Sequence, residues 1–390
     1  MKVIRFAIIG IGSMGFAHAK TLAEGAVDGA ALAAAADIDP KRLELAKEQW
    51  PDVACYPDTD ALLAAGGVDA VIIATPHPCH TELARKVLAA GLPVLSEKPA
   101  DILFDKVLEA REIAREKGLP YAIMFNQRNN PVYRKLYEML HSGELGAIKR
   151  VNWTVTTWYR TDAYYASGAW RGSWKGEGGG VLLNQAPHNL DMINHLFGVP
   201  QKVYAHLSYG KFHPAIDVED EAILMLSYDG FDLIFSTSTG EYPGSNRMEI
   251  ACEAGKVVAE GGEITCYRLP VSERVLCASE DRNGPRVKPE IVKIPTPGED
   301  TAHLGILQTF TDHLRYGTPL TADITDGLNE IMLSNAAYLS AWTGEEVSLP
   351  LTDGRFARLL RERREADERD ITGNADSETG GYSHRWQVKW

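Results

Sequence analysis

The sequence has few cysteines, no block of basic residues and no long apolar run, and each absence narrows the possible functions. The five cysteines are odd in number, are scattered and show no CxxC spacing; they stand at Cys55, Cys79, Cys252, Cys266 and Cys277. This usage argues against a disulfide framework and against a zinc site, and it suits a reducing compartment. We therefore expect no bound metal and a cytoplasmic location.

The charge balance and the hydropathy exclude two classes of partner. The formal net charge is −13, whereas binding to nucleic acid or to an anionic membrane needs a local excess of Lys and Arg. No apolar run approaches the roughly 20 residues that span a bilayer. The short apolar run at the start continues into a glycine pattern and not into a signal-peptide cleavage site. We expect neither nucleic acid nor a membrane as partner.

The first third of the chain alternates short apolar segments with helical stretches. A chain of 390 residues exceeds what one hydrophobic core usually serves, so two domains are expected. Apolar segments at 5–9, 31–36, 70–74 and 93–96 are short and bounded by helical patterns, which is typical of parallel strands joined by helical crossovers. The pattern predicts a Rossmann-type, doubly wound parallel sheet over residues 1–125.

The pattern changes near residue 126 to strands in hairpin order. A helix is predicted at 131–141, followed by strands at 150–159, 203–209, 221–228 and 231–237, the last two joined by the turn signal Asp229-Gly230. Further helices are predicted at 181–197, 304–316 and 326–343. The fold class is therefore α/β, with an α+β domain carrying a large, mostly antiparallel open sheet over 126–371. The polar tail 372–390 holds Trp386 and Trp390, which predict docking on this or a neighbouring subunit, with a frayed terminus as the alternative.

A glycine-rich loop after the first predicted strand indicates a dinucleotide site. Gly10 permits a tight turn, Gly12 lets the backbone approach a pyrophosphate, and Gly15 allows close packing of helix on strand. The intervening Ser13 and Met14 open the helix, whose free N–H groups attract phosphate. Asp37 falls at the end of the second predicted strand, where a carboxylate accepts hydrogen bonds from a ribose 2′-hydroxyl and repels a 2′-phosphate. The loop therefore predicts NAD as cofactor, in preference to NADP.

Three further segments extend this pattern across the chain. They are Ile72-Ile73-Ala74-Thr75-Pro76 with His80 shortly after, Ser96-Glu97-Lys98-Pro99, and Gly178-Gly179-Gly180 leading through Asn184 to His188 and Asp191. Together with the glycine loop, these segments resemble the glucose-fructose oxidoreductase / inositol dehydrogenase / MocA (Gfo/Idh/MocA) family of NAD(P)-dependent oxidoreductases, over residues 5 to about 350.

The resemblance implies a substrate cleft between a Rossmann domain and a domain whose open sheet often mediates oligomerisation, so that a homodimer or homotetramer is expected. Members of the family mostly oxidise or reduce sugars, cyclitols and their derivatives. Lys98 matches the catalytic lysine of the family and His188 its catalytic histidine. Asn184 stands where many members have Asp, which places in doubt any scheme that needs a carboxylate there. Trp170 and Arg171 match a pair that lies close to the cofactor or substrate.

The predicted catalytic residues fit the oxidation of a secondary alcohol. His188 can accept and return a proton near neutral pH, and Lys98 can hydrogen-bond the same oxygen and stabilise a developing alkoxide. Asn184 and His188 are four residues apart, so one helical face would present both, with Asn184 orienting the substrate. Asp191 and His195 extend that face, but their spacing is not that of a known zinc helix, and the chemistry needs no metal.

Other residues are assigned to the cofactor or substrate by position. Thr75, Pro76 and His77 follow a predicted parallel strand and should line the nicotinamide ribose. The remaining predicted cofactor contacts are His80, Glu97, Lys98 and Gln127, besides Trp170 and Arg171. Aromatic faces stack on sugar rings, and the stretch 158–174 is rich in them. The predicted substrate contacts are Arg128, Tyr159 and Tyr165, together with Lys98, Asn184 and His188.

The sequence leaves two other functions open. One is a glycosidase or epimerase in which tightly held NAD is reduced and reoxidised within one turnover. The other is a non-catalytic regulator that binds NAD and sugar, although Lys98 and His188 would then have no evident purpose.

Overall fold

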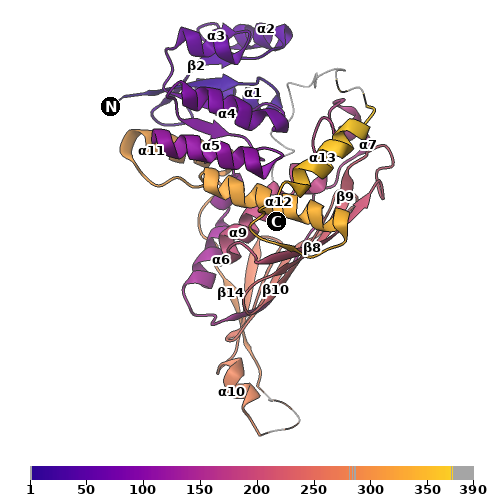
Figure 1. Cartoon of the computed structure of the whole chain (residues 1–390). Helices are drawn as coiled ribbons and strands as arrows, with labels where there is room; N and C mark the ends of the chain where they lie inside the picture. Colours follow the sequence, from indigo (N-terminus) through magenta and orange to yellow (C-terminus); the bar gives the residue numbers. More distant parts are fainter. Residues whose placement is uncertain (1, 281, 283, 285–286, 370, 372–390) are drawn as a thin grey trace.

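The structure is a computed structural model that describes residues 2–280, 282, 284, 287–369 and 371. The predicted docking tail 372–390, with both of its tryptophans, lies outside these residues. The described chain forms two sheets placed end to end, with the N-terminal sheet and its helices above a larger, twisted sheet (Figure 1).

The first sheet has six strands in the order β3-β2-β1-β4-β5-β6, all parallel. The strands are β1 (Ile4–Ile9), β2 (Ala30–Ala36), β3 (Ala54–Tyr56), β4 (Ala70–Ile73), β5 (Val94–Ser96) and β6 (Tyr121–Ile123). The helical connections are α1 (Ser13–Ala23), α2 (Pro40–Gln49), α3 (Thr59–Ala65), the short η1 (His77–Cys79), α4 (His80–Ala89) and α5 (Phe104–Lys117). Since the strand order reverses between β1 and β4, loops at their carboxyl ends open a crevice there. The predicted doubly wound sheet is confirmed.

The second sheet has nine strands in the order β14-β13-β12-β11-β7-β10-β9-β8-β15. They are β7 (Ile148–Val155), β8 (Lys202–Tyr209), β9 (Glu219–Ser227), β10 (Asp232–Ser238), β11 (Asn246–Cys252), β12 (Gly255–Glu260), β13 (Glu263–Arg268), β14 (Glu290–Ile294) and β15 (Val347–Ser348). Among the described residues of this sheet, only β7 and β10 pair in parallel. The hairpin at Asp229-Gly230 joins β9 to β10 as predicted, and the sheet is mostly antiparallel.

Some helices of the second half lie against one face of this sheet, others lie against the first half, and one lies in the connection between β13 and β14 (Figure 1). They are η2 (Asn126–Asn129), α6 (Pro131–His141), α7 (Asp162–Ala166), α8 (Val181–Asn184), α9 (Pro187–Phe197), α10 (Glu273–Cys277), α11 (Ala302–Tyr316), α12 (Ile324–Thr343) and α13 (Arg355–Ala366). The helix α12 contacts α5 above it and α9 and β8 below it (Figure 1). No described helix is long and apolar enough to cross a membrane.

One element departs from the predicted division at residue 125. The helix α11 follows the second sheet in sequence but packs on the first, where the Phe310 ring lies 6.1 Å from that of Phe6 on β1. The Gln308 side chain accepts a hydrogen bond from Asp28 N at 2.8 Å. The apolar face of α11 thus completes the core of the N-terminal half, and its first residues are carried to the crevice.

Candidate active site

The glycine loop requires its glycines for steric reasons. Gly10 has a φ of 90°, and a Cβ there would lie 2.7 Å from the Ala74 carbonyl oxygen. A Cβ on Gly15 would lie 1.8 Å from the Gly10 carbonyl oxygen. Gly12 is the N-cap of α1, and no side chain caps the helix. The first N–H groups of α1 are therefore available to an anion, as the sequence predicts.

A cavity of about 550 Å³ opens over this loop. Most predicted cofactor residues line it; these are Gly10, Gly12, Ser13, Met14, Asp37, Thr75, Pro76, His77, Glu97, Lys98, Trp170 and Arg171. Three of them carry buried polar atoms without a hydrogen-bond partner in the part of the chain that the structure describes: Ser13 Oγ, Thr75 Oγ1 and His77 Nδ1. Buried polar groups are normally paired, so three unpaired polar atoms on residues that line one cavity fit a polar ligand such as a dinucleotide.

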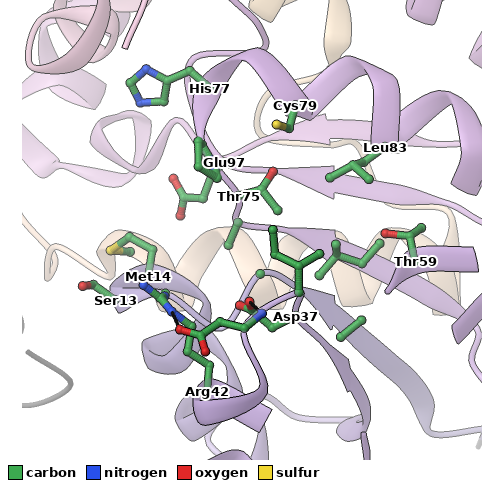
Figure 2. A pocket seen from close by; sticks show the side chains of 18 of the residues that line it. Ser13, Met14, Asp37, Arg42, Thr59, Thr75, His77, Cys79, Leu83 and Glu97 are labelled. Atoms are coloured by element: carbon green, nitrogen blue, oxygen red, sulfur yellow. Dashed lines mark hydrogen bonds and ion pairs between the residues drawn. The ribbon is translucent and has the colours of Figure 1, made fainter. Parts of the chain in front are cut away.

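One edge of the cavity carries the acidic residue Asp37 and the basic residue Arg42. Asp37 Oδ2 accepts from Ile11 N at 2.6 Å and Oδ1 from Asp39 N at 2.9 Å, which fixes the carboxylate beside the loop. The Arg42 guanidinium crosses above Gly12, with its Nη1 2.8 Å from where a Cβ would stand. Figure 2 shows Asp37 and Arg42 beside Ser13 and Met14, with His77 on the opposite edge. Sequence reasoning found Asp37 and missed Arg42, five residues further along.

Lys98 lies at the other end of the cavity, where the two halves meet. Its Nζ donates to the Asn184 carbonyl oxygen at 2.8 Å. Burial lowers the pKa of Lys98 to about 8, although the Glu97 carboxylate acts in the opposite direction. A buried amine whose pKa lies near neutral pH can both donate a hydrogen bond and exchange a proton.

His188 is buried behind this end, 4% exposed, and does not line the cavity. Burial lowers its pKa well below the usual value, and the neighbouring Lys98 ammonium acts in the same direction. Its Nδ1 has no hydrogen-bond partner within the described ranges. The ring is therefore a neutral imidazole, able to accept a proton.

The predicted helix over 181–197 is wrong in one respect that concerns the site. The segment forms two helices, α8 ending at Asn184 and α9 beginning at Pro187. Proline lacks an N–H and fixes its φ, so it opens a helix more readily than it continues one. Asn184 and His188 therefore do not share one helical face, and only Asn184 lines the cavity.

A polar network that the sequence analysis did not identify surrounds Asn184. The Asn184 amide donates to the Glu177 carboxylate and, at 3.2 Å, to the Tyr164 hydroxyl. Arg171 Nη1 donates to the same hydroxyl at 2.7 Å. Burial raises the pKa of Glu177 to about 7, against the effect of the Arg171 cation. The only sequence signal for Glu177 is its place directly before the three glycines.

A second group joins Glu97 to histidines of both halves. His18 Nε2 lies 2.7 Å from Glu97 Oε1, and the His303 ring at the start of α11 lies 5.8 Å from the His18 ring. His303 also lines the cavity. Nothing local in the sequence marks His303, because only the return of α11 to the first sheet brings it here.

Three predicted cofactor residues lie outside the cavity lining: Gly15, which packs against the Gly10 carbonyl, His80 and Gln127. Both ring nitrogens of His80 lie 2.7 Å from carbonyl oxygens, those of Pro99 and Thr75. His80 therefore connects the loops that present Thr75 and Lys98. Gln127 is 4% exposed, and its amide has no partner among the described residues.

Three predicted substrate residues are placed elsewhere. Arg128 donates to Asp191 at 2.9 and 2.6 Å and to the Thr321 carbonyl at 3.0 Å, and an ion pair with Asp326 measures 2.8 Å. Its donors are committed to protein groups, namely the buried Asp191, the half-buried Asp326 and the Thr321 carbonyl, so the structure does not present Arg128 to a substrate.

The two tyrosines have other contacts. Tyr159 is exposed and faces Tyr242. The Tyr165 hydroxyl donates to Thr239 at 3.2 Å, and its ring packs on His213. Neither lines the cavity, and it is their neighbour Tyr164 that reaches Asn184.

Asp191 and His195 have other contacts in the structure. Asp191 is paired with Arg128, and the His195 ring stacks on Tyr137 at 4.5 Å. Within the described ranges, no group of three or more His, Cys, Asp or Glu could hold a metal ion.

Comparison with known sequences identifies the class. Residues 4–125 match the profile described as an oxidoreductase family with NAD-binding Rossmann fold. Residues 133–258 match the C-terminal domain of the same Gfo/Idh/MocA family. The chain therefore belongs to this family of NAD-binding oxidoreductases, as the motifs indicated.

Individual relatives are distant. The inositol 2-dehydrogenase of Rhizobium meliloti is 24% identical over 352 residues, 89% of this chain and 99% of that protein. An uncharacterized oxidoreductase of Schizosaccharomyces pombe is 30% identical over 186 residues, which is 47% of this chain and about half (49%) of that protein. The crystal structure of the WlbA dehydrogenase from Bordetella pertussis, in complex with NADH and UDP-GlcNAcA, has a TM-score of 0.75 at 26% identity and covers 90% of this chain and 100% of that one.

Proposed function

We propose that the protein is an NAD-dependent dehydrogenase that interconverts a secondary alcohol of a sugar, glycoside or cyclitol and the corresponding ketone. The observation that carries the proposal is the Lys98 ammonium, held 2.8 Å from the Asn184 carbonyl at the end of the glycine-loop cavity. A relative is an inositol dehydrogenase, and a similar structure contains a nucleotide sugar, which supports this substrate class.

The residues have distinct roles in this proposal. The loop of Gly10 and Gly12 holds a pyrophosphate and Asp37 holds the adenosine ribose, while Thr75 and His77 contact the other half of the dinucleotide. Bound NAD would supply the two-electron acceptor. Lys98 donates a hydrogen bond to the substrate oxygen and stabilises negative charge on it.

The proton of the substrate hydroxyl needs an acceptor near neutral pH. We assign this base to His188, a buried neutral imidazole close to Lys98, because a neutral imidazole can accept a proton without first losing one, although burial and the Lys98 ammonium both lower its pKa. Asn184, which lines the cavity, carries an amide that can orient a polyol, and the Tyr164 hydroxyl accepts a hydrogen bond from that amide. Trp170 lines the same end of the cavity and offers an aromatic face to a sugar ring.

A panel of pyranoses, glycosides and inositols with NAD, and separately with NADP, tests the proposal. Absorbance of free NADH should rise with one group of polyols, and Lys98→Ala and His188→Ala should each lower that rate by at least about a hundredfold. If substrate is converted and no free NADH appears, the protein is instead a glycosidase or epimerase in which bound NAD is reduced and reoxidised within one turnover. Binding of NADH with no conversion of any panel member would refute an enzymatic role.

We also propose a homodimer or homotetramer that forms through the second sheet. Tyr204, Ile223, Met225 and Ile234 are exposed on β8, β9 and β10, and Met225 is directly opposite both Tyr204 and Ile234 in the strand register. Contiguous exposed apolar side chains are typical of an interface. Light scattering of the wild type and of Met225→Lys tests it, since a monomeric wild type would contradict the proposal.

A further inference from the structure

His303 is presented to the cofactor cavity by an unfavourable backbone conformation. The preceding residue, Ala302, has a φ of 43° and is the one non-glycine residue with positive φ among the described residues. Side chains of L-residues enter this region only at an energetic cost. Such outliers persist where surrounding contacts impose them, and they concentrate at functional sites.

The contacts that impose this conformation come from Asn129 and Asn130, at the end of η2, and from Asp300, just before α11. Asn129 Nδ2 donates to the Ala302 carbonyl at 2.9 Å. Asp300 Oδ1 accepts from Ala302 N at 2.9 Å, and its Oδ2 accepts from Asn130 Nδ2 at 3.2 Å. The N–H and the carbonyl group of Ala302 are thus both held by hydrogen bonds, and these bonds fix the direction in which the chain presents His303.

The ring of His303 has a defined donor. Asn126 Nδ2 lies 3.4 Å from His303 Nδ1, and with the amide in this orientation Nδ1 is the acceptor. Burial lowers the pKa of His303 to about 4, so the ring is neutral and its single proton is on Nε2. No hydrogen bond from Nε2 to a protein group is found within the described ranges.

The neighbours of His303 show which part of a dinucleotide it would meet. It lines the cavity with Glu97 and Lys98, far from the Asp37 edge that would hold adenosine. The Glu97 oxygens are already used, by His18 at 2.7 Å and by Lys98 N at 3.3 Å. Among the described residues at this end of the cavity, no protein group accepts a hydrogen bond from His303 Nε2, so this N–H can donate to a ligand.

We propose that His303 is a cofactor-binding residue that donates a hydrogen bond from Nε2 to an oxygen of the nicotinamide riboside of NAD. Asn129 is its positioning residue, acting through the Ala302 carbonyl. The inference rests on the proposed function in taking the Lys98 end of the cavity as the nicotinamide end.

The test is binding, which needs no knowledge of the substrate. Kd values for NADH and for ADP, which lacks the nicotinamide riboside, are measured by fluorescence titration and calorimetry on the full-length chain. His303→Ala should weaken NADH binding about tenfold, the loss expected for one hydrogen bond, and leave ADP binding unchanged. His313→Ala, a histidine on the same helix outside the cavity lining, is the matched control and should change neither.

The positioning role has its own readout. Asn129→Ala should weaken NADH binding about threefold, and the double variant should bind no more weakly than His303→Ala, because both act through one contact. Additive losses would overturn the positioning role. Equal losses for NADH and ADP, or none, in His303→Ala would overturn the assignment, whereas a wild type that binds neither ligand would instead defeat the proposed function.

Discussion

Replacing Glu177 by glutamine should stabilise the protein in a strongly pH-dependent way. Glu177 is 1% exposed, and its oxygens accept from the Asn184 amide and, at 2.6 Å, from Gly172 N. Burial raises its pKa from 4.5 to about 7. The folded state thus retains a proton that the unfolded state has lost between these two values, so stability falls as the pH rises through this window.

The size of the effect follows from the pKa. A change from 4.5 to about 7 corresponds to about 3 kcal/mol of destabilisation once the pH exceeds the higher value. Glutamine resembles the protonated acid in shape and charge, and a flip of the Asn184 amide would give its NH₂ group an acceptor. Glu177→Gln should therefore nearly match the wild type at about pH 4 and exceed it by about 3 kcal/mol at about pH 8, or about 4 °C in Tm.

Thermal unfolding at the two pH values measures this difference. Glu138→Gln removes an exposed carboxylate paired with Lys135 on α6 and should change Tm by less than about 1 °C at either pH. The pH profile of turnover adds a functional readout. Because the Glu177 carboxylate raises the pKa of Lys98, its loss should move the Lys98 limb of that profile to lower pH. An unchanged stability difference between the two pH values would show that Glu177 is not a buried acid of raised pKa.

Three other substitutions test separate parts of the site. Lys98→Met should lower turnover by about a thousandfold while NADH binding changes less than about threefold, measured by steady-state rates and titration; retained turnover would exclude Lys98 from the chemistry. Asp37→Ser should raise the kcat/KM for NADP relative to NAD by about tenfold or more, because Arg42 remains to pair with a 2′-phosphate. An unchanged ratio would show that Asp37 does not select NAD over NADP. Arg128→Met should lower the free energy of unfolding by about 3 kcal/mol in denaturant unfolding, because it leaves Asp191 buried without its partner. A stable variant with a raised KM would show that Arg128 contacts the substrate.

The sequence predicts the cofactor side of the molecule better than the substrate side. The glycine loop, Asp37 and Thr75 lie close to strand ends of a regular parallel sheet, so their sequence positions determine their place at the crevice. Local signals also determine the start of α2, where Asp39 caps the helix by accepting from Lys41 N at 3.0 Å.

The substrate side depends on contacts between distant segments. Tyr164 and Tyr165 are adjacent in an aromatic stretch, and only the packing of α7 decides that Tyr164 reaches Asn184 while Tyr165 reaches Thr239. Pro187 carries a local signal for a helix start, which the prediction of one continuous helix over 181–197 did not use. Arg128 has the sequence position of a ligand contact but is neutralised by acids on α9 and α12.

The two halves share one cavity, and ionisable side chains such as Lys98 and Glu177 are buried where the halves meet. Lys98 from the first sheet points to Asn184 of the second half, and His303 returns from beyond the second sheet to Glu97 of the first. A charge that is buried between two elements costs free energy unless a partner arrives from the opposite one. The Lys98 ammonium and the Glu177 carboxylate attract each other across this junction, but burial costs each charge more than this attraction returns, so the pKa of Lys98 is lowered and that of Glu177 is raised. Stability of the junction and reactivity of the site are on this view one electrostatic property, which is why a substitution at Glu177 should increase the first while it alters the second.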